Sequence, residues 1–66
     1  MNLPQEGRVR LPSVLAACGI SKSTVLRLVA AGRFPPPIAI GSRLNLWDVA
    51  AVRAWIADPE MWRAQQ

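Results

Sequence analysis

The sequence contains few of the side chains from which most active sites are built. It has no histidine, one cysteine and four acidic residues among its 66 positions. Metal centres and general acid–base catalysis depend mainly on these residue types. The composition therefore argues against an enzyme, and we expect no metal, no cofactor and no small-molecule substrate.

The one cysteine, Cys18, has no partner for an internal disulfide, which favours a reducing compartment such as the bacterial cytoplasm. It ends the tetrapeptide LAAC, the sequence of a bacterial lipoprotein cleavage site. The apolar segment before it, residues 11–17, is at the lower limit of ~7 residues for a signal peptide and contains a proline, so we expect no export. The longest uncharged stretch, residues 11–21, is shorter than the ~20 residues of a membrane span. We therefore expect a cytoplasmic protein without a membrane partner.

Acidic side chains are outnumbered by basic ones. Eight lysines and arginines and four acids give a net charge of +4, and seven of the eight cations are arginine. Guanidinium groups suit phosphates and base edges, but an anionic membrane surface or an acidic protein would also attract them. At 52% apolar and 18% charged residues, the chain is too hydrophobic for a disordered tail. Its length allows one small domain.

Two short helices are predicted in the first half of the chain. Apolar residues from Leu11 to Cys18 recur with the spacing of one helical stripe, and Gly19 ends that helix. Ser21 is a good N-cap for a second helix, which Gly32 closes. The buried stripe of this helix is Val25, Leu28 and Val29. The opposite face carries Lys22, Ser23, Leu26, Arg27 and Ala30.

A small hairpin is predicted after three consecutive prolines, residues 35–37, which forbid helix and hold the chain extended. A three-residue loop over residues 41–43 fits best, because it puts four aliphatic side chains on one inner face. The expected pairs are Ile40 with Leu44 and Ile38 with Leu46. Arg43 then projects from the tip.

A third helix is predicted from Asp48, its N-cap, to the Asp58–Pro59 break. Its expected core residues are Val49, Val52, Trp55 and Ile56. A last turn over residues 60–64 carries Trp62, which serves either as a fold-back anchor or as a partner contact. The expected organisation is a flexible arm over residues 1–9, one domain over residues 10–58 and a C-terminal turn or tail over residues 59–66.

Two short helices, a hairpin with Arg43 at its tip and a third helix, taken together, resemble a known family. The runs GISKSTVLRLV from Gly19 and GRFP from Gly32 are similar to the small excisionase-type regulators of the AlpA family, relatives of the MerR winged helix. The similarity continues through the hairpin to Ile56. Leu26 stands where an aromatic residue is common, and Ala51 where an acid usually precedes the valine. The resemblance implies a mainly α fold with a small β-hairpin, a winged helix-turn-helix of three helices and a two-stranded wing.

The second helix is then the expected recognition helix, and the hairpin the expected wing. Lys22, Ser23 and Arg27 are placed to enter the major groove of DNA, whereas Arg43 would meet phosphate or the minor groove. Arg33 and Arg10 would contact the phosphate backbone at most. Leu26 and Trp62 remain candidates for contact with a base or with a neighbouring protomer. The full set of expected DNA contacts is Ser21, Lys22, Ser23, Arg27, Arg33, Ser42 and Arg43.

The resemblance implies one of two roles for a protein that binds duplex DNA. The first is a recombination directionality factor, or excisionase, which assembles along DNA and bends it for a phage or integrative-element recombinase. The second is an AlpA-like transcriptional regulator. A protein-interaction module, such as an adaptor or antitoxin-like regulator, is the alternative from another class. Only DNA binding would weaken steeply with salt.

Overall fold

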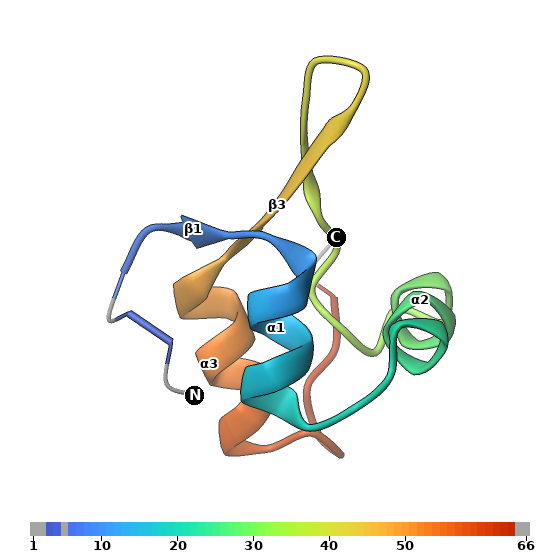
Figure 1. Ribbon diagram of the computed structural model, residues 1–66. Coiled ribbons are helices and arrows are strands. Elements are labelled where there is room, and N and C mark those ends of the chain that lie inside the picture. The colour runs from blue at the N-terminus through green and yellow to red at the C-terminus, as the bar shows by residue number, and fades with distance from the viewer. Residues whose placement is uncertain (1–2, 5, 65–66) are drawn as a thin grey trace.

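The structure is a computed structural model that describes residues 3–4 and 6–64. It is mainly α-helical with a small antiparallel sheet, as the sequence predicted, and is compatible with a winged helix-turn-helix (Figure 1). The elements in chain order are β1 (Arg8–Val9), α1 (Leu11–Cys18), α2 (Lys22–Ala30), β2 (Ile38–Ile40), β3 (Leu44–Asp48) and α3 (Val49–Ala57).

Helices α1 and α2 form the helix-turn-helix. Gly19 ends α1 in the left-handed conformation, at φ 71°, and its N–H donates to the Leu15 carbonyl at 2.8 Å. After the short turn to Ser21, α2 runs at 96° to α1, within the range of ~90–120° typical of this motif. No single helix in the described part of the chain has the length and apolar character to cross a membrane, and α1 and α2 meet that test only together, as a bent pair.

Both ends of α2 are fixed as the sequence predicted. The Ser21 hydroxyl accepts a hydrogen bond from the Thr24 N–H at 3.3 Å. At the other end Gly32 has φ 74°, a left-handed conformation that favours glycine. Its N–H donates to the Val29 carbonyl, and the next N–H, of Arg33, donates to the Leu28 carbonyl at 2.8 Å. These two bonds are the Schellman pattern, which satisfies carbonyls left free at a helix end.

The hairpin has the predicted register. Ile40 pairs with Leu44 and Ile38 with Leu46, around the three-residue loop 41–43. The inner face of this hairpin is less buried than expected, and Ile40 is 44% exposed. The reason is that the hairpin extends away from the three helices, so nothing from them covers its outer half (Figure 1).

The sheet has a third strand that the sequence analysis did not predict. Arg8 and Val9, expected in a flexible arm, pair with Asp48 and Trp47 on the edge of β3 opposite β2. The pairing continues through Gly7, whose carbonyl accepts from the Val49 N–H at 2.9 Å. Val9 also packs against the core, which explains why this segment docks. Residues 1, 2 and 5 of the expected arm lie outside the described residues.

The core lies between the base of the sheet and the helices. It consists of buried side chains from every helix, from β3 and from the residue before the three prolines, namely Val14, Val25, Phe34, Trp47, Val52 and Trp55. The Phe34 and Trp55 rings meet edge to face, with centroids 4.8 Å apart. Each tryptophan also donates its indole N–H to a backbone carbonyl, Trp47 to Pro35 at 3.0 Å and Trp55 to Arg33 at 2.9 Å. Segment 33–35 is therefore fixed between α2 and the hairpin.

The end of α3 departs from the prediction. Ile56, expected in the core, is 40% exposed, and Trp62 packs against the core instead. Asp58 starts a turn over residues 59–61, because its carbonyl accepts from the Trp62 N–H. The chain then runs back to α2, where the Ala64 N–H donates to the Gly32 carbonyl at 2.9 Å. Trp62 is thus a fold-back anchor, one of the two roles expected for it.

Candidate nucleic-acid interface

The outward face of α2 is the one that the sequence predicted. Val25 is fully buried and Leu28 and Val29 are half-buried, so the apolar stripe points into the domain. The exposed residues are Lys22, Ser23, Leu26, Arg27 and Ala30. The helix contains no acidic side chain, so its exposed face is purely cationic and polar apart from Leu26 and Ala30.

Hydroxyl groups at the start of α2 form a small hydrogen-bonded cluster. The Ser21 Oγ lies 2.9 Å from the Thr24 Oγ1 and 3.3 Å from the Ser23 Oγ, besides capping the helix. Ser21 therefore acts first as a cap, and its hydroxyl is already engaged. The Thr24 Oγ1 also accepts from the Arg27 Nη2 at 3.4 Å. Thr24, which was not among the predicted site residues, thus makes a long, exposed hydrogen bond with the guanidinium of Arg27.

The tip of the hairpin presents Ser42 and Arg43 to solvent. Both are exposed, as is Gly41, whose φ of 67° allows the three-residue loop. The hairpin extends from the body of the domain, so its tip stands apart from α2 (Figure 1). Arg33 is exposed as well, but both of its backbone groups are hydrogen-bonded: its N–H donates to the Leu28 carbonyl, and its carbonyl accepts from the Trp55 indole. Ser21, Lys22, Ser23 and Arg27 thus lie on α2 and its N-cap, whereas Ser42 and Arg43 lie at the tip of the hairpin.

The charges are divided along the chain, a signal that the sequence analysis missed. Between Gly7 and Trp47 there are six cations and no acid, whereas three of the four acids lie from Asp48 onward. Two of those acids have structural tasks, because the Asp48 carboxylate caps α3 and the Asp58 carboxylate accepts from the Met61 N–H. The segment that contains the helix-turn-helix and the hairpin up to Trp47 therefore carries only positive charge, which attracts a polyanion.

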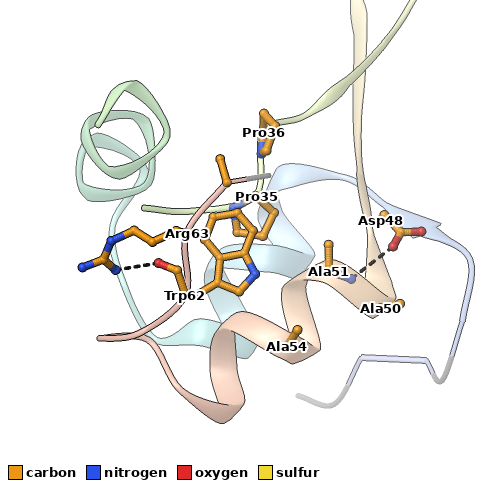
Figure 2. A pocket seen from close by; sticks show the side chains of 9 residues that line it. Pro35, Pro36, Asp48, Ala50, Ala51, Ala54, Trp62 and Arg63 are labelled. Atoms are coloured by element: carbon orange, nitrogen blue, oxygen red, sulfur yellow. Dashed lines mark hydrogen bonds between the residues drawn. The ribbon is translucent and has the colours of Figure 1, made fainter. Parts of the chain in front are cut away.

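A groove of about 450 Å³ lies between α3, the prolines and the C-terminal segment (Figure 2). Alanines, prolines and Trp62 form most of its wall. The Asp48 carboxylate at its edge accepts from the Ala51 N–H at 3.1 Å. Arg63 donates to the Glu60 and Trp62 carbonyls, each at 2.7 Å. The polar groups of this groove are therefore already engaged in holding the fold.

The remaining reactive side chain is Cys18, which is half-buried on α1. Burial removes water from the thiol and raises its pKa above the ordinary value. A raised pKa keeps the sulfur protonated at neutral pH and lowers its reactivity. Among residues 3–4 and 6–64, no three side chains of the metal-ligating types His, Cys, Asp and Glu gather where they would hold an ion.

A helix-turn-helix with a basic exposed helix, next to a hairpin with a basic tip, is a combination typical of small DNA-binding regulators. Residues 7–60 match the family model of the prophage CP4-57 regulatory protein, AlpA, and the chain belongs to this family. It is also 38% identical over 56 residues to the uncharacterized protein ORF88 of Enterobacteria phage P4. That alignment covers 85% of this chain and 64% of the phage protein. No solved structure matches the chain significantly.

Proposed function

We propose that the chain binds duplex DNA with α2 in the major groove and the hairpin tip at the neighbouring phosphates or minor groove. The observation that carries this proposal is the cationic, acid-free face of α2, held at 96° to α1. Lys22, Ser23 and Arg27 supply donors for base edges and phosphates, because both cations and hydroxyls contact these groups in DNA complexes. Arg43 on the wing adds a contact outside the groove that α2 occupies.

The first test separates positioning contacts from base readout. Arg43→Ala should weaken binding to every duplex and lower the slope of log affinity against log salt by about one. Arg27→Ala should cost ~1–3 kcal/mol on the selected site and less on random DNA. Arg53→Ala, which removes an exposed arginine from α3, is the matched control and should change neither. Fluorescence anisotropy across a salt series measures all three.

An unchanged salt slope for Arg43→Ala would place the wing away from DNA. Equal losses on specific and random DNA would make Arg27 a phosphate contact. Wild-type affinity that does not depend on salt would contradict DNA binding as a whole and favour the protein-interaction module, whose apolar contacts are nearly insensitive to salt.

For the biological role, we propose a recombination directionality factor that assembles along DNA and bends it for a recombinase. One small module contacts too little DNA, ~600–1,000 Å² of protein surface, to specify a long site alone. Several copies side by side would supply both specificity and a cumulative bend. Gel shifts on a multi-site fragment should show later copies binding more tightly than the first, and circular permutation should show a bend that grows with occupancy.

The second candidate role is transcriptional regulation, which the description of the family as regulatory proteins favours. A stable dimer in the absence of DNA that occupies a single palindromic site without bending it would support this role over the first. Size-exclusion chromatography with light scattering and the same permutation assay make the distinction.

A further inference from the structure

We propose that Leu26 reads a thymine: its side chain contacts the 5-methyl group of a thymine in the major groove, between the contacts made by Lys22 and Arg27. This inference rests on the proposed placement of α2 in DNA. It assigns a base preference to the one large apolar side chain on an otherwise cationic and polar helix face.

The fold does not need Leu26 for its core. The core side of α2 is complete with Val25 at 0% exposure and with Leu28 and Val29 packed against the core, whereas Leu26 is 50% exposed. Leucine at this position is therefore not explained by packing within the chain. A single exposed leucine would be unremarkable elsewhere on a surface, but this one lies on the surface proposed to meet DNA.

The position of Leu26 on the helix is central. With 3.6 residues per turn, each residue advances by about 100°, so Leu26 and Ala30 project between Lys22 on one side and Ser23 and Arg27 on the other. The Arg27 guanidinium donates to the Thr24 hydroxyl, 3.4 Å away, and Leu26 is exposed. The small side chain of Ala30, one turn farther on, leaves room for a base edge to approach.

The chemistry of the major groove selects thymine as the partner. Thymine alone among the four bases presents an apolar group there, its C5 methyl, whereas the other bases offer hydrogen-bond donors and acceptors. A leucine pressed against guanine or adenine would strip water from those polar atoms without replacing the hydrogen bonds. Leu26 therefore favours thymine both by contact and by excluding the alternatives.

A second copy of the chain is the competing occupant of this face. Two copies that met through the same face would bring the cations Lys22 and Arg27 of each copy together, with no acid on α2 to balance them. Such a contact places like charges side by side in a partly dehydrated interface, which is unfavourable. The charge around Leu26 fits DNA better than it fits a symmetric protein interface.

The test replaces thymine with deoxyuridine, which keeps every hydrogen-bonding group and lacks only the methyl. Sites are first selected by the full chain from a random duplex pool, and each thymine of the selected site is then replaced singly. We expect one position at which deoxyuridine weakens binding about fourfold, the effect of losing one buried methyl group. For Leu26→Ala the same replacement should have no effect, whereas Leu26→Met, which keeps an apolar contact, should retain most of it.

Met61→Ala is the matched control, because Met61 is an apolar side chain 73% exposed outside α2, and it should leave the deoxyuridine effect unchanged. Thermal melts monitored by circular dichroism should show that Leu26→Ala is folded. Tight, salt-dependent binding that ignores deoxyuridine at every position would overturn this inference and leave the proposed function standing. So would loss of cooperativity in Leu26→Ala with the deoxyuridine effect intact, since that result assigns Leu26 to a neighbouring copy. Failure of the wild-type chain to select any duplex would overturn both proposals.

Discussion

Helices α2 and α3 are built by the same local rules and serve opposite purposes. Each has nine residues and each follows an apolar residue and a polar N-cap. Ser21 accepts from the N–H of Thr24, and Asp48 accepts from the N–H of Ala51. Yet α2 buries only one residue completely, whereas α3 has three buried residues, Val49, Val52 and Trp55.

The difference between the two helices shows that capping residues determine where a helix begins but not how much of it is buried. Capping residues decide where a helix begins, because they satisfy the first free N–H groups. How much of the helix is buried depends instead on what packs against it, and α3 carries Trp55 between Phe34 and the Arg33 carbonyl. Helix α3 therefore holds the domain together, while α2 has a face available for a partner.

The largest effect that follows from this comparison concerns Trp55. Trp55→Ala should lower the free energy of unfolding by ~3–5 kcal/mol, because it removes a buried aromatic side chain and its contact with Phe34. The loss also leaves the Arg33 carbonyl without its indole donor. For a domain of 66 residues, whose total stability is of order 3–10 kcal/mol, this loss is a large fraction of the total. Urea denaturation followed by tryptophan fluorescence and circular dichroism measures this change.

The control for Trp55→Ala is Leu26→Ala on α2. This variant removes an exposed side chain and should change stability by no more than ~0.5 kcal/mol. A loss for Leu26→Ala as large as that for Trp55→Ala would mean that α2 packs more tightly than its exposure indicates, and the contrast between the two helices would fail.

The two N-caps should have intermediate and similar effects. Ser21→Ala and Asp48→Ala each leave an N–H of the first helical turn without its acceptor, at a cost of ~0.5–2 kcal/mol. Asp48→Ala should be the more costly of the two, because the carboxylate also interacts favourably with the positive end of the helix dipole. Thermal denaturation of the two variants checks this order.

Conservative caps provide the control for these variants. Asp48→Asn and Ser21→Asp keep a side-chain acceptor and should recover most of the stability. If Ser21→Ala were neutral, the hydroxyl cluster with Ser23 and Thr24 would be dispensable for the start of α2, and the capping account of that helix would be wrong.

Most of the fold was predictable because its signals are local. Glycines at the helix ends, polar caps and apolar spacing gave the three helices, and loop length gave the hairpin register. The third strand was missed because β1 has only two residues, Arg8 and Val9, too few to show an alternation of apolar and polar side chains. It is ordered by pairing with β3, which is distant in sequence. The exposure of Ile40 and Ile56 was missed for a related reason, since burial depends on which other elements reach those positions.

The exposure of the candidate residues on α2 was predictable from the sequence, but the contacts among their side chains were not. The spacing along one helix placed Lys22, Ser23 and Arg27 on one face, which the structure shows as exposed. The hydrogen bonds that join the Ser21 and Thr24 hydroxyls, and Thr24 to Arg27, depend on side-chain conformations that no sequence pattern specifies. The division of charge at Asp48 is present in the sequence itself, and a count of charges by segment would have found it.

The smallest effect on stability separates folding from function on the same two helices. Arg27 on α2 and Arg53 on α3 are both exposed, so Arg27→Gln and Arg53→Gln should each change the free energy of unfolding by less than ~0.5 kcal/mol. The hydrogen bond from Arg27 to Thr24 is long and exposed and contributes little. Their effects on DNA should nevertheless differ, because only Arg27 lies on the face proposed to enter the groove. Paired measurements of urea denaturation and DNA affinity on both variants decide this. If Arg53→Gln weakened DNA binding as much as Arg27→Gln at equal stability, the division of labour between α2 and α3 would be wrong.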